Sequence, residues 1–170
     1  MPVTSDPVLR SEIDALIERF RVGAERTAAV TAGASTAEAD FTPSAGVWCI
    51  RTLVCHLSDS ELVGAHRFRL VIAEDEPMLT AYDQNAWSLR LNYGGRRLSE
   101  ALDSFRTLRA LNFDLLRGLP PATYARTGRH AERGPVSLLD LLRTYTEHAE
   151  GHARQIQSVR EKYRESRKGS

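Results

Sequence analysis

Four long stretches of the chain repeat apolar residues at the spacing of an α-helix, and this pattern most limits what the chain can fold into. The stretches cover about residues 6–33, 47–73, 99–117 and 137–163, and each has one apolar face to bury. Strand signals are almost absent, because no segment of useful length alternates apolar and polar residues. The pattern predicts an all-α fold, a four-helix bundle within a single domain spanning residues 1–170.

The ends of these stretches carry residues that start and stop helices. Asp6 followed by Pro7 suits an N-cap and the first helical position. Gly33 is a stop signal after the first stretch. Ser137 and Asp140 form a capping-box pattern at the start of the fourth stretch. We therefore expect these helices to begin and end close to the limits of the apolar pattern.

The connection between the second and third helices is too long for a tight turn. It covers residues 74–97 and contains YDQNAWSLRLNYGG, in which a short helix is predicted at about residues 83–89. Long loops in compact domains are often functional. We expect Asp83, Trp87 and Tyr93 to lie over any site between the helices, although a packing role is the simpler interpretation of the tryptophan.

Charge and composition argue against several classes of protein. The formal net charge is +1, so no strong field attracts nucleic acid or an anionic membrane. The chain lacks an apolar run of signal-peptide type or of bilayer-spanning length. Cys49 and Cys55 are too poorly spaced for a redox pair, a zinc knuckle or a disulfide. We expect a cytoplasmic protein that binds neither nucleic acid nor membrane.

Two histidines, His148 and His152, are four residues apart in the fourth helix. At 100° per residue both point toward the buried face, and Gln155 follows on the same flank. Buried imidazoles need partners for both ring nitrogens, and this spacing allows two of them to bind one metal ion. The alternative at this stage is a pair of hydrogen-bonded core histidines.

The second helix offers a third imidazole, His56, on the flank of its apolar stripe. Three histidines from two helices would leave coordination positions open, as in catalytic metal centres. Glu61 falls near the middle of the same stripe, where a carboxylate is costly unless it is paired. It could orient a ligand histidine or pair with an arginine such as Arg154. Gln155 could contact substrate or close the pocket.

Several familiar metal motifs are absent. The sequence HAEGH lacks the glutamate of H-E-x-x-H, and no E-x-x-H occurs, which argues against a ferritin-like di-iron bundle. His66 is expected on the polar side of its helix and His130 in a glycine- and arginine-rich loop, both exposed to solvent. Arg51 is interpreted as a surface residue and Cys55 as a buried structural one.

Three segments, in order along most of the chain, resemble the DinB-like superfamily of small bacterial four-helix proteins. VWCIRTLVCHLSDSE, residues 47–61, is similar to the second helix of that family. PMLTAYDQNAW, residues 77–87, resembles its connection with aspartate and tryptophan. GPVSLLDLLRTYTEHAEGHARQI, residues 134–156, resembles its last helix. The resemblance rests on the three segments together, in this order and at this spacing.

The resemblance implies a bundle of crossed-over topology, often a homodimer, with one divalent metal ion held by three histidines. The ion is commonly zinc or nickel in the family, and iron or manganese would also accept imidazoles. Matching the motifs residue by residue makes the ligands His56, His148 and His152.

Members of this superfamily include bacillithiol transferases and the mycothiol-dependent maleylpyruvate isomerase. Their shared chemistry is an open metal position that lowers the pKa of a bound thiol. The resemblance therefore implies a metal-dependent S-transferase that uses a low-molecular-weight thiol on a small-molecule substrate, in detoxification or stress. The alternatives are a metal-dependent hydrolase and a non-catalytic helical binding module in which the metal is structural or absent.

Overall fold

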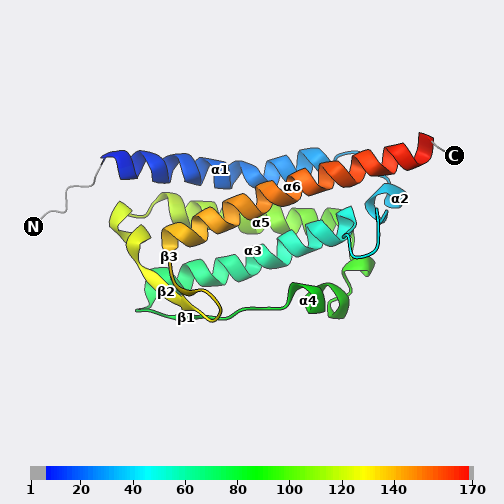
Figure 1. Cartoon of the computed structure of the whole chain (residues 1–170). Coiled ribbons are helices and arrows are strands. Elements are labelled where there is room, and N and C mark those ends of the chain that lie inside the picture. The colour runs from blue at the N-terminus through cyan, green and yellow to red at the C-terminus, as the bar shows by residue number, and fades with distance from the viewer. Residues whose placement is uncertain (1–6, 169–170) are drawn as a thin grey trace, which may run out of the picture.

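Four long helices run side by side in the computed structural model, which describes residues 7–168 (Figure 1). Both α1 and α3 pack against α5 and α6, so the chain crosses a diagonal of the bundle on its way from α1 to α3. The predicted four-helix bundle is confirmed, and so is its crossed-over topology. The four helices are α1 (Pro7–Thr31), α3 (Ile50–Ala73), α5 (Leu98–Arg117) and α6 (Leu138–Lys168).

The predicted helix ends lie within three residues of those in the structure except at the end of α6, which runs to Lys168 where the pattern ended at about residue 163. α1 begins at Pro7, while the proposed cap, Asp6, lies outside the described residues. Gly33 follows the end of α1 with φ of +69°, a conformation that favours glycine. The capping box is formed, since Ser137 Oγ accepts from the Asp140 N–H at 3.0 Å and the Asp140 carboxylate accepts from the Ser137 N–H at 3.2 Å.

A small sheet at one end of the bundle was not predicted (Figure 1). It consists of β1 (Met78–Leu79), β2 (Thr127–His130) and β3 (Gly134–Ser137), with β1 parallel and β3 antiparallel to the central β2. Strands of two to four residues are too short to show an alternating pattern. The sheet joins the connection after α3 to the hairpin before α6, so two distant loops close the same end of the bundle.

The short helix predicted in the long connection is confirmed as α4 (Gln84–Arg90). Asp83 caps it by accepting hydrogen bonds from the N–H groups of Asn85 and Ala86. A short 3-10 helix, η1 (Tyr93–Gly95), follows before α5 begins. The connection therefore has defined structure of its own, and it lies alongside α3 (Figure 1).

The interpretation of Arg51 as a surface residue is wrong. Its guanidinium pairs with Asp40, just after the short helix α2 (Thr36–Ala39), at 2.6 Å and donates to the Arg96 carbonyl at 2.8 Å. Only 12% of the side chain is exposed. One partner precedes α3 in the sequence and the other follows it. A helical wheel of α3 shows neither of them, so it could not predict the burial of Arg51.

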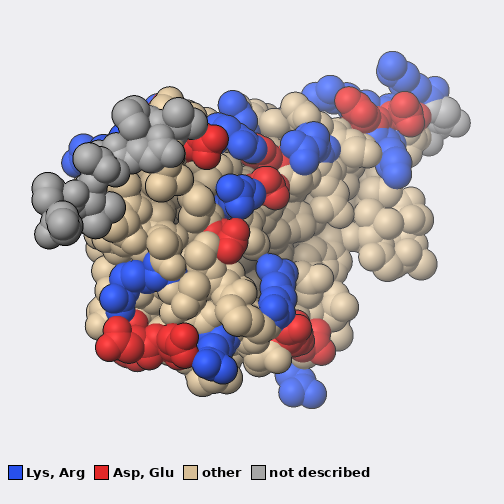
Figure 2. Space-filling view, turned by 60° about the vertical axis from the view of Figure 1, so that its left-hand side comes forward, with Lys and Arg blue, Asp and Glu red and all other residues tan. Residues whose placement is uncertain are grey.

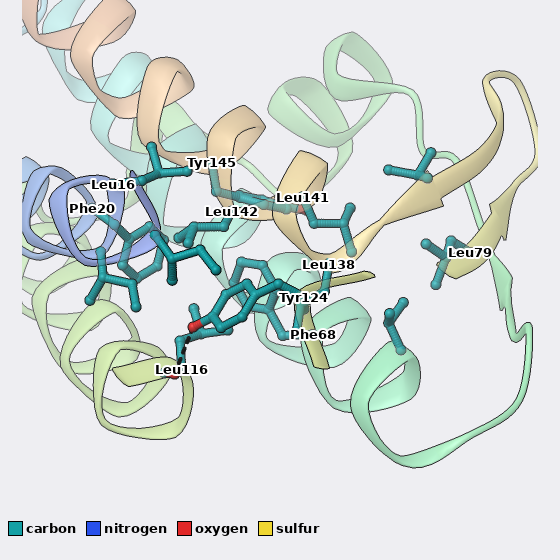
Figure 3. Packing of buried hydrophobic residues seen from close by; sticks show 14 residues of the cluster. Leu16, Phe20, Phe68, Leu79, Leu116, Tyr124, Leu138, Leu141, Leu142 and Tyr145 are labelled. Carbon is teal, nitrogen blue, oxygen red and sulfur yellow. Dashed lines mark hydrogen bonds between the residues drawn. The ribbon is translucent and has the colours of Figure 1, made fainter. Parts of the chain in front are cut away.

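The larger apolar cluster lies at the sheet end, where residues from all four long helices meet (Figure 3). Phe20 of α1 and Phe68 of α3 make an edge-to-face contact with ring centroids 6.0 Å apart. Tyr124, in the 3-10 helix η2 (Pro121–Ala125), donates its hydroxyl proton to the Leu116 carbonyl at 2.7 Å. Each large apolar side chain buried here stabilises the fold by about 1.5–3 kcal/mol.

Charged residues of both signs are interspersed on the surface shown in Figure 2, in keeping with the small net charge. Within residues 7–168, no helix combines the length and apolar character needed to cross a bilayer. Cys49 and Cys55 are both free thiols, as predicted.

Candidate metal centre

Three polar residues and a glycine recur along the face of α3 that meets α6. They are His56, Ser60, Gly64 and Arg67, which are spaced by three or four residues and so share one side of the helix. On α6, Tyr145, His148 and His152 follow the same rule. The two helices pack against each other, so these side chains meet in the groove between them.

The three imidazoles predicted from the sequence come together at this seam. Nε2 of His148 lies 2.9 Å from Nε2 of His56 and 2.9 Å from Nε2 of His152. His56 is only 1% exposed, while the other two are partly buried. A helix-spacing argument therefore placed three side chains correctly, although two of them come from a helix that begins more than 80 residues after His56.

This arrangement suits a cation better than hydrogen bonds alone. The single Nε2 of His148 faces two other Nε2 atoms, and one ring nitrogen cannot satisfy both with one proton or one lone pair. Three imidazole nitrogens that share a zinc ion at about 2.0–2.1 Å would be about 3.0–3.4 Å apart, depending on the angle at the ion. The observed spacing of 2.9 Å is close to that range.

The hydrogen bond of His152 leaves its Nε2 free to act as a ligand. Nδ1 of His152 lies 2.9 Å from Oε1 of Gln155, and an amide oxygen can only accept. The ring proton is therefore on Nδ1, which leaves a lone pair on Nε2 directed at the other two rings. Gln155, expected to contact substrate or close the pocket, orients a histidine.

Burial keeps the three rings neutral. Burial, together with the charge that His152 would carry, lowers the pKa of His56 to about 4. Burial and the two neighbouring imidazoles lower the pKa of His148 to about 3, and burial also lowers the pKa of His152. Neutral imidazole is the form that binds metal ions, so the site is ready for a cation at pH 7.

Glu61 belongs to a buried network on the other side of α3. Its carboxylate accepts from Arg109 at 2.7 Å and from Asn112 at 2.8 Å, both on α5. Arg109 also donates to the carbonyls of Phe20 and Tyr145. Of the two predicted roles for Glu61, orienting a ligand histidine or pairing with an arginine, the structure shows the second. The arginine is Arg109 and not Arg154. The network links all four long helices.

A cavity of about 220 Å³ adjoins the histidines. His56 and His148 form part of its wall, and the long connection contributes Tyr82 and Gln84. The connection thus covers the cavity, but through residues next to those proposed. Asp83 caps α4, Trp87 stacks on Tyr82 with centroids 4.4 Å apart, and Tyr93 is buried in the core.

The prediction that His130 is exposed is wrong, whereas His66 is exposed as predicted. His130 ends β2, lines the cavity and has only 8% of its surface accessible. It turns inward because the segment forms a strand, and alternate residues of a strand face opposite sides. The short hairpin could have been suspected from the glycine at position 134, because glycine is a common turn residue. In the structure Gly134 has a φ of +73°.

Cys55 is not available as a nucleophile in this cavity. Its thiol is buried, lies 3.8 Å from the Tyr93 carbonyl and does not line the cavity. Burial raises the pKa of the thiol to about 11, so it stays protonated at neutral pH. The prediction of a structural cysteine is confirmed.

The buried polar residues that were missed in the sequence include two on α5. Arg109 and Asn112 lie between Phe105 and Leu116 on the buried face of α5. The four residues follow one another at spacings of four, three and four, which is the pattern of a buried helix face. The signal for the pair was present, since a buried acid on α3 requires a partner on a neighbouring helix.

Comparisons with known proteins agree with this architecture. A family model described as the DinB superfamily matches residues 19–156. A protein of Oceanobacillus iheyensis, named as a candidate metal-dependent hydrolase, is 29% identical over 120 residues, 71% of this chain and 69% of that protein. A Bacillus pumilus protein of the same description is 28% identical over 148 residues, 86% of this chain and 84% of that protein.

A solved structure is also similar. YfiT from Bacillus subtilis, described as a probable metal-dependent hydrolase with an unusual four-helix bundle topology, superposes with a TM-score of 0.84. The match covers 94% of this chain and 90% of that one at 24% sequence identity. At this identity the likeness supports the fold, including the diagonal crossing between α1 and α3.

Proposed function

Because the chain belongs to the DinB superfamily, we propose that it is a metal-dependent enzyme whose divalent ion is held by His56, His148 and His152. The observation that carries this proposal is the convergence of three neutral imidazoles beside a cavity. Among the described residues, no thiol or carboxylate joins this group as a fourth ligand. Such a site leaves coordination positions for substrate, as in catalytic centres.

The ion would supply Lewis acidity, lowering the pKa of a thiol or water bound beside it. The chain contributes the surroundings. Gln155 fixes the tautomer of His152, and the surrounding protein keeps His56 almost completely away from water. Tyr145, whose pKa is raised by burial to about 12, stays a phenol and can donate a proton in hydrogen bonds to a ligand.

The reaction we propose first is transfer of a low-molecular-weight thiol to a small electrophile. The thiol has to come from outside the chain, because neither Cys49 nor Cys55 lines the cavity and Cys55 remains protonated. A cavity of about 220 Å³ accepts part of a small molecule but no peptide or nucleic-acid strand. Zinc and nickel are the ions to test first.

Hydrolysis is the second candidate, and it is favoured by the description of the relatives as candidate metal-dependent hydrolases. Here water bound at the open position would be the nucleophile. Among the described residues that line the cavity, the only acid is Glu132, which is exposed on the β2–β3 turn. The described cavity wall therefore offers no buried carboxylate base beside the histidines. This favours thiol transfer over hydrolysis as the first reaction to test.

The first test is the metal content of the purified protein, measured by plasma mass spectrometry. We expect about one equivalent of metal per chain, lost in His148→Ala and retained in His66→Ala, which removes an exposed histidine of the same helix as His56. No metal in the native protein, even after incubation with zinc or nickel, would overturn the proposal.

A second assay separates the two reactions. The metal-loaded protein is mixed with bacillithiol, mycothiol or glutathione and a chromogenic electrophile, and in parallel with activated esters without thiol. Turnover that requires the thiol supports S-transfer. Ester hydrolysis without it, at a rate abolished by His148→Ala, supports the hydrolase instead.

A further inference from the structure

The cavity beside the histidines carries positive charge that the described carboxylates do not pair. Arg67 of α3 and Arg133 of the β2–β3 turn both line it. Neither makes an ion pair with an acid within residues 7–168. Two guanidinium groups on one cavity wall are the usual means of binding a carboxylate or phosphate.

Arg67 is held in position by neutral partners. One of its terminal nitrogens donates to the Tyr145 hydroxyl at 3.1 Å, and the other donates to the Thr80 carbonyl. These bonds fix the guanidinium beside the cavity without neutralising its charge. The bond to Tyr145 also uses a lone pair of that hydroxyl, so the phenol proton remains available for a ligand.

His130 adds a neutral donor next to the two arginines. Its Nδ1 accepts from the N–H of Glu132 at 3.2 Å, so the ring proton is on Nε2. Burial and the charges of Arg67 and Arg133 lower the pKa of His130, so this ring does not itself bring a further charge at pH 7. An imidazole N–H on the cavity wall is a directional donor to an oxyanion.

These donors are separated from the metal site along the groove. Arg67 follows His56 by about three turns of α3 and lies on the same face. Tyr145 lies between them and packs on Gly64, where an added Cβ would come within 2.8 Å of the ring. One end of the cavity therefore has histidines for a metal, and the other has cationic and neutral donors.

We propose that the Arg67, Arg133 and His130 end of the cavity binds an oxyanion group of the substrate, a carboxylate or a phosphate. The protein would then act on small anionic molecules that place their reacting atom at the histidines. This proposal rests on the proposed function, because the histidine end is taken to hold the metal.

The test compares two thiols of equal chain length, one ending in a carboxylate and the other in a neutral hydroxyl group. The protein is loaded with cobalt(II), and binding of 6-mercaptohexanoate or 6-mercaptohexanol is followed by the thiolate-to-cobalt absorption band. We expect the carboxylate to bind about ten-fold more tightly. Arg67→Met should remove most of that advantage and Arg133→Met about a three-fold part of it, whereas the affinity for the neutral thiol stays unchanged.

Arg97→Met is the matched control, because Arg97 is highly exposed and pairs with Glu100 away from the cavity. It should leave the preference for the carboxylate intact. Equal affinity for the two thiols in the native protein, or a preference that persists in both cavity variants, overturns the proposal. If Arg67→Met fails to fold, Arg133→Met on the exposed turn decides the result.

A second arm separates this proposal from the proposed function. Metal-free protein is titrated calorimetrically with hexanoate and with hexyl phosphate. Millimolar binding that weakens about three-fold in Arg133→Met and more strongly in Arg67→Met supports the anion site. It does so even if neither thiol alters the cobalt spectrum, a result that would count only against the S-transfer reaction. No binding of either anion to the native protein counts against the anion site. The tighter of the two anions identifies the group.

Discussion

The buried pair of Glu61 and Arg109 offers the sharpest test of how the bundle is held together. The two side chains are 1% and 2% exposed and their charged atoms are 2.7 Å apart. The change Glu61→Leu leaves Arg109 charged in the interior without its acid, and removal of one partner from a buried pair costs about 3–5 kcal/mol. Loss of the bond from Asn112 contributes to that cost.

This loss is a large part of the stability of an ordinary domain, which is about 5–15 kcal/mol. Urea unfolding followed by circular dichroism at pH 7 measures it directly. The melting temperature should fall by about 6–20 °C, since each kcal/mol shifts it by about 2–4 °C at this chain length. Arg106→Met is the control, because Arg106 pairs with Glu25 on the surface and should cost less than about 1 kcal/mol.

The double variant Glu61→Leu with Arg109→Met tests the reasoning. It removes both charges and leaves mainly Asn112 without an acceptor, a cost of about 1–3 kcal/mol. It should therefore be more stable than Glu61→Leu alone. A double variant as unstable as the sum of the two single changes would refute the argument that an uncompensated charge dominates the loss.

Three further predictions follow from local geometry. Gly64→Ala should destabilise the fold by about 1–3 kcal/mol in urea unfolding, because the new methyl group would meet the ring of Tyr145 at 2.8 Å; a gain in stability would mean that the ring moves freely. Ser137→Ala should cost about 1 kcal/mol in the same assay by removing the helix cap, and an unchanged midpoint would contradict that role. The pKa of His56 is lowered from 6.5 to about 4, so between these pH values the unfolded chain binds more protons than the folded one. The free energy of unfolding of metal-free protein should therefore decrease as the pH falls through this range, by up to about 1.4 kcal/mol per pH unit for this histidine. In His56→Phe this slope with pH should be shallower. An equal slope in the variant would contradict the lowered pKa of His56.

The sequence alone determined the four long helices, the capping box of the last one and the inward direction of three histidines. These features depend on interactions within a few residues, namely the 3.6-residue period of an α-helix and hydrogen bonds from a cap to the next turn. The short helix in the long connection was recovered for the same reason. His148 and His152 are one turn apart, so their common direction followed from helical geometry before any tertiary contact was known.

Only the tertiary structure decided the sheet, the partner of Glu61 and the position of His130. β1 and β2 are separated by about 50 residues, and strands of two to four residues are stable only when paired with each other. Glu61 required a partner on principle, but the choice of Arg109 over Arg154 depends on which helices pack against α3. His130 turned inward because its segment pairs with β1, and this pairing brings it to the same cavity as Arg67. Contacts between residues far apart in the chain leave no periodic trace in it, which is why the end of the cavity lined by Arg67, Arg133 and His130 became visible only in the folded molecule.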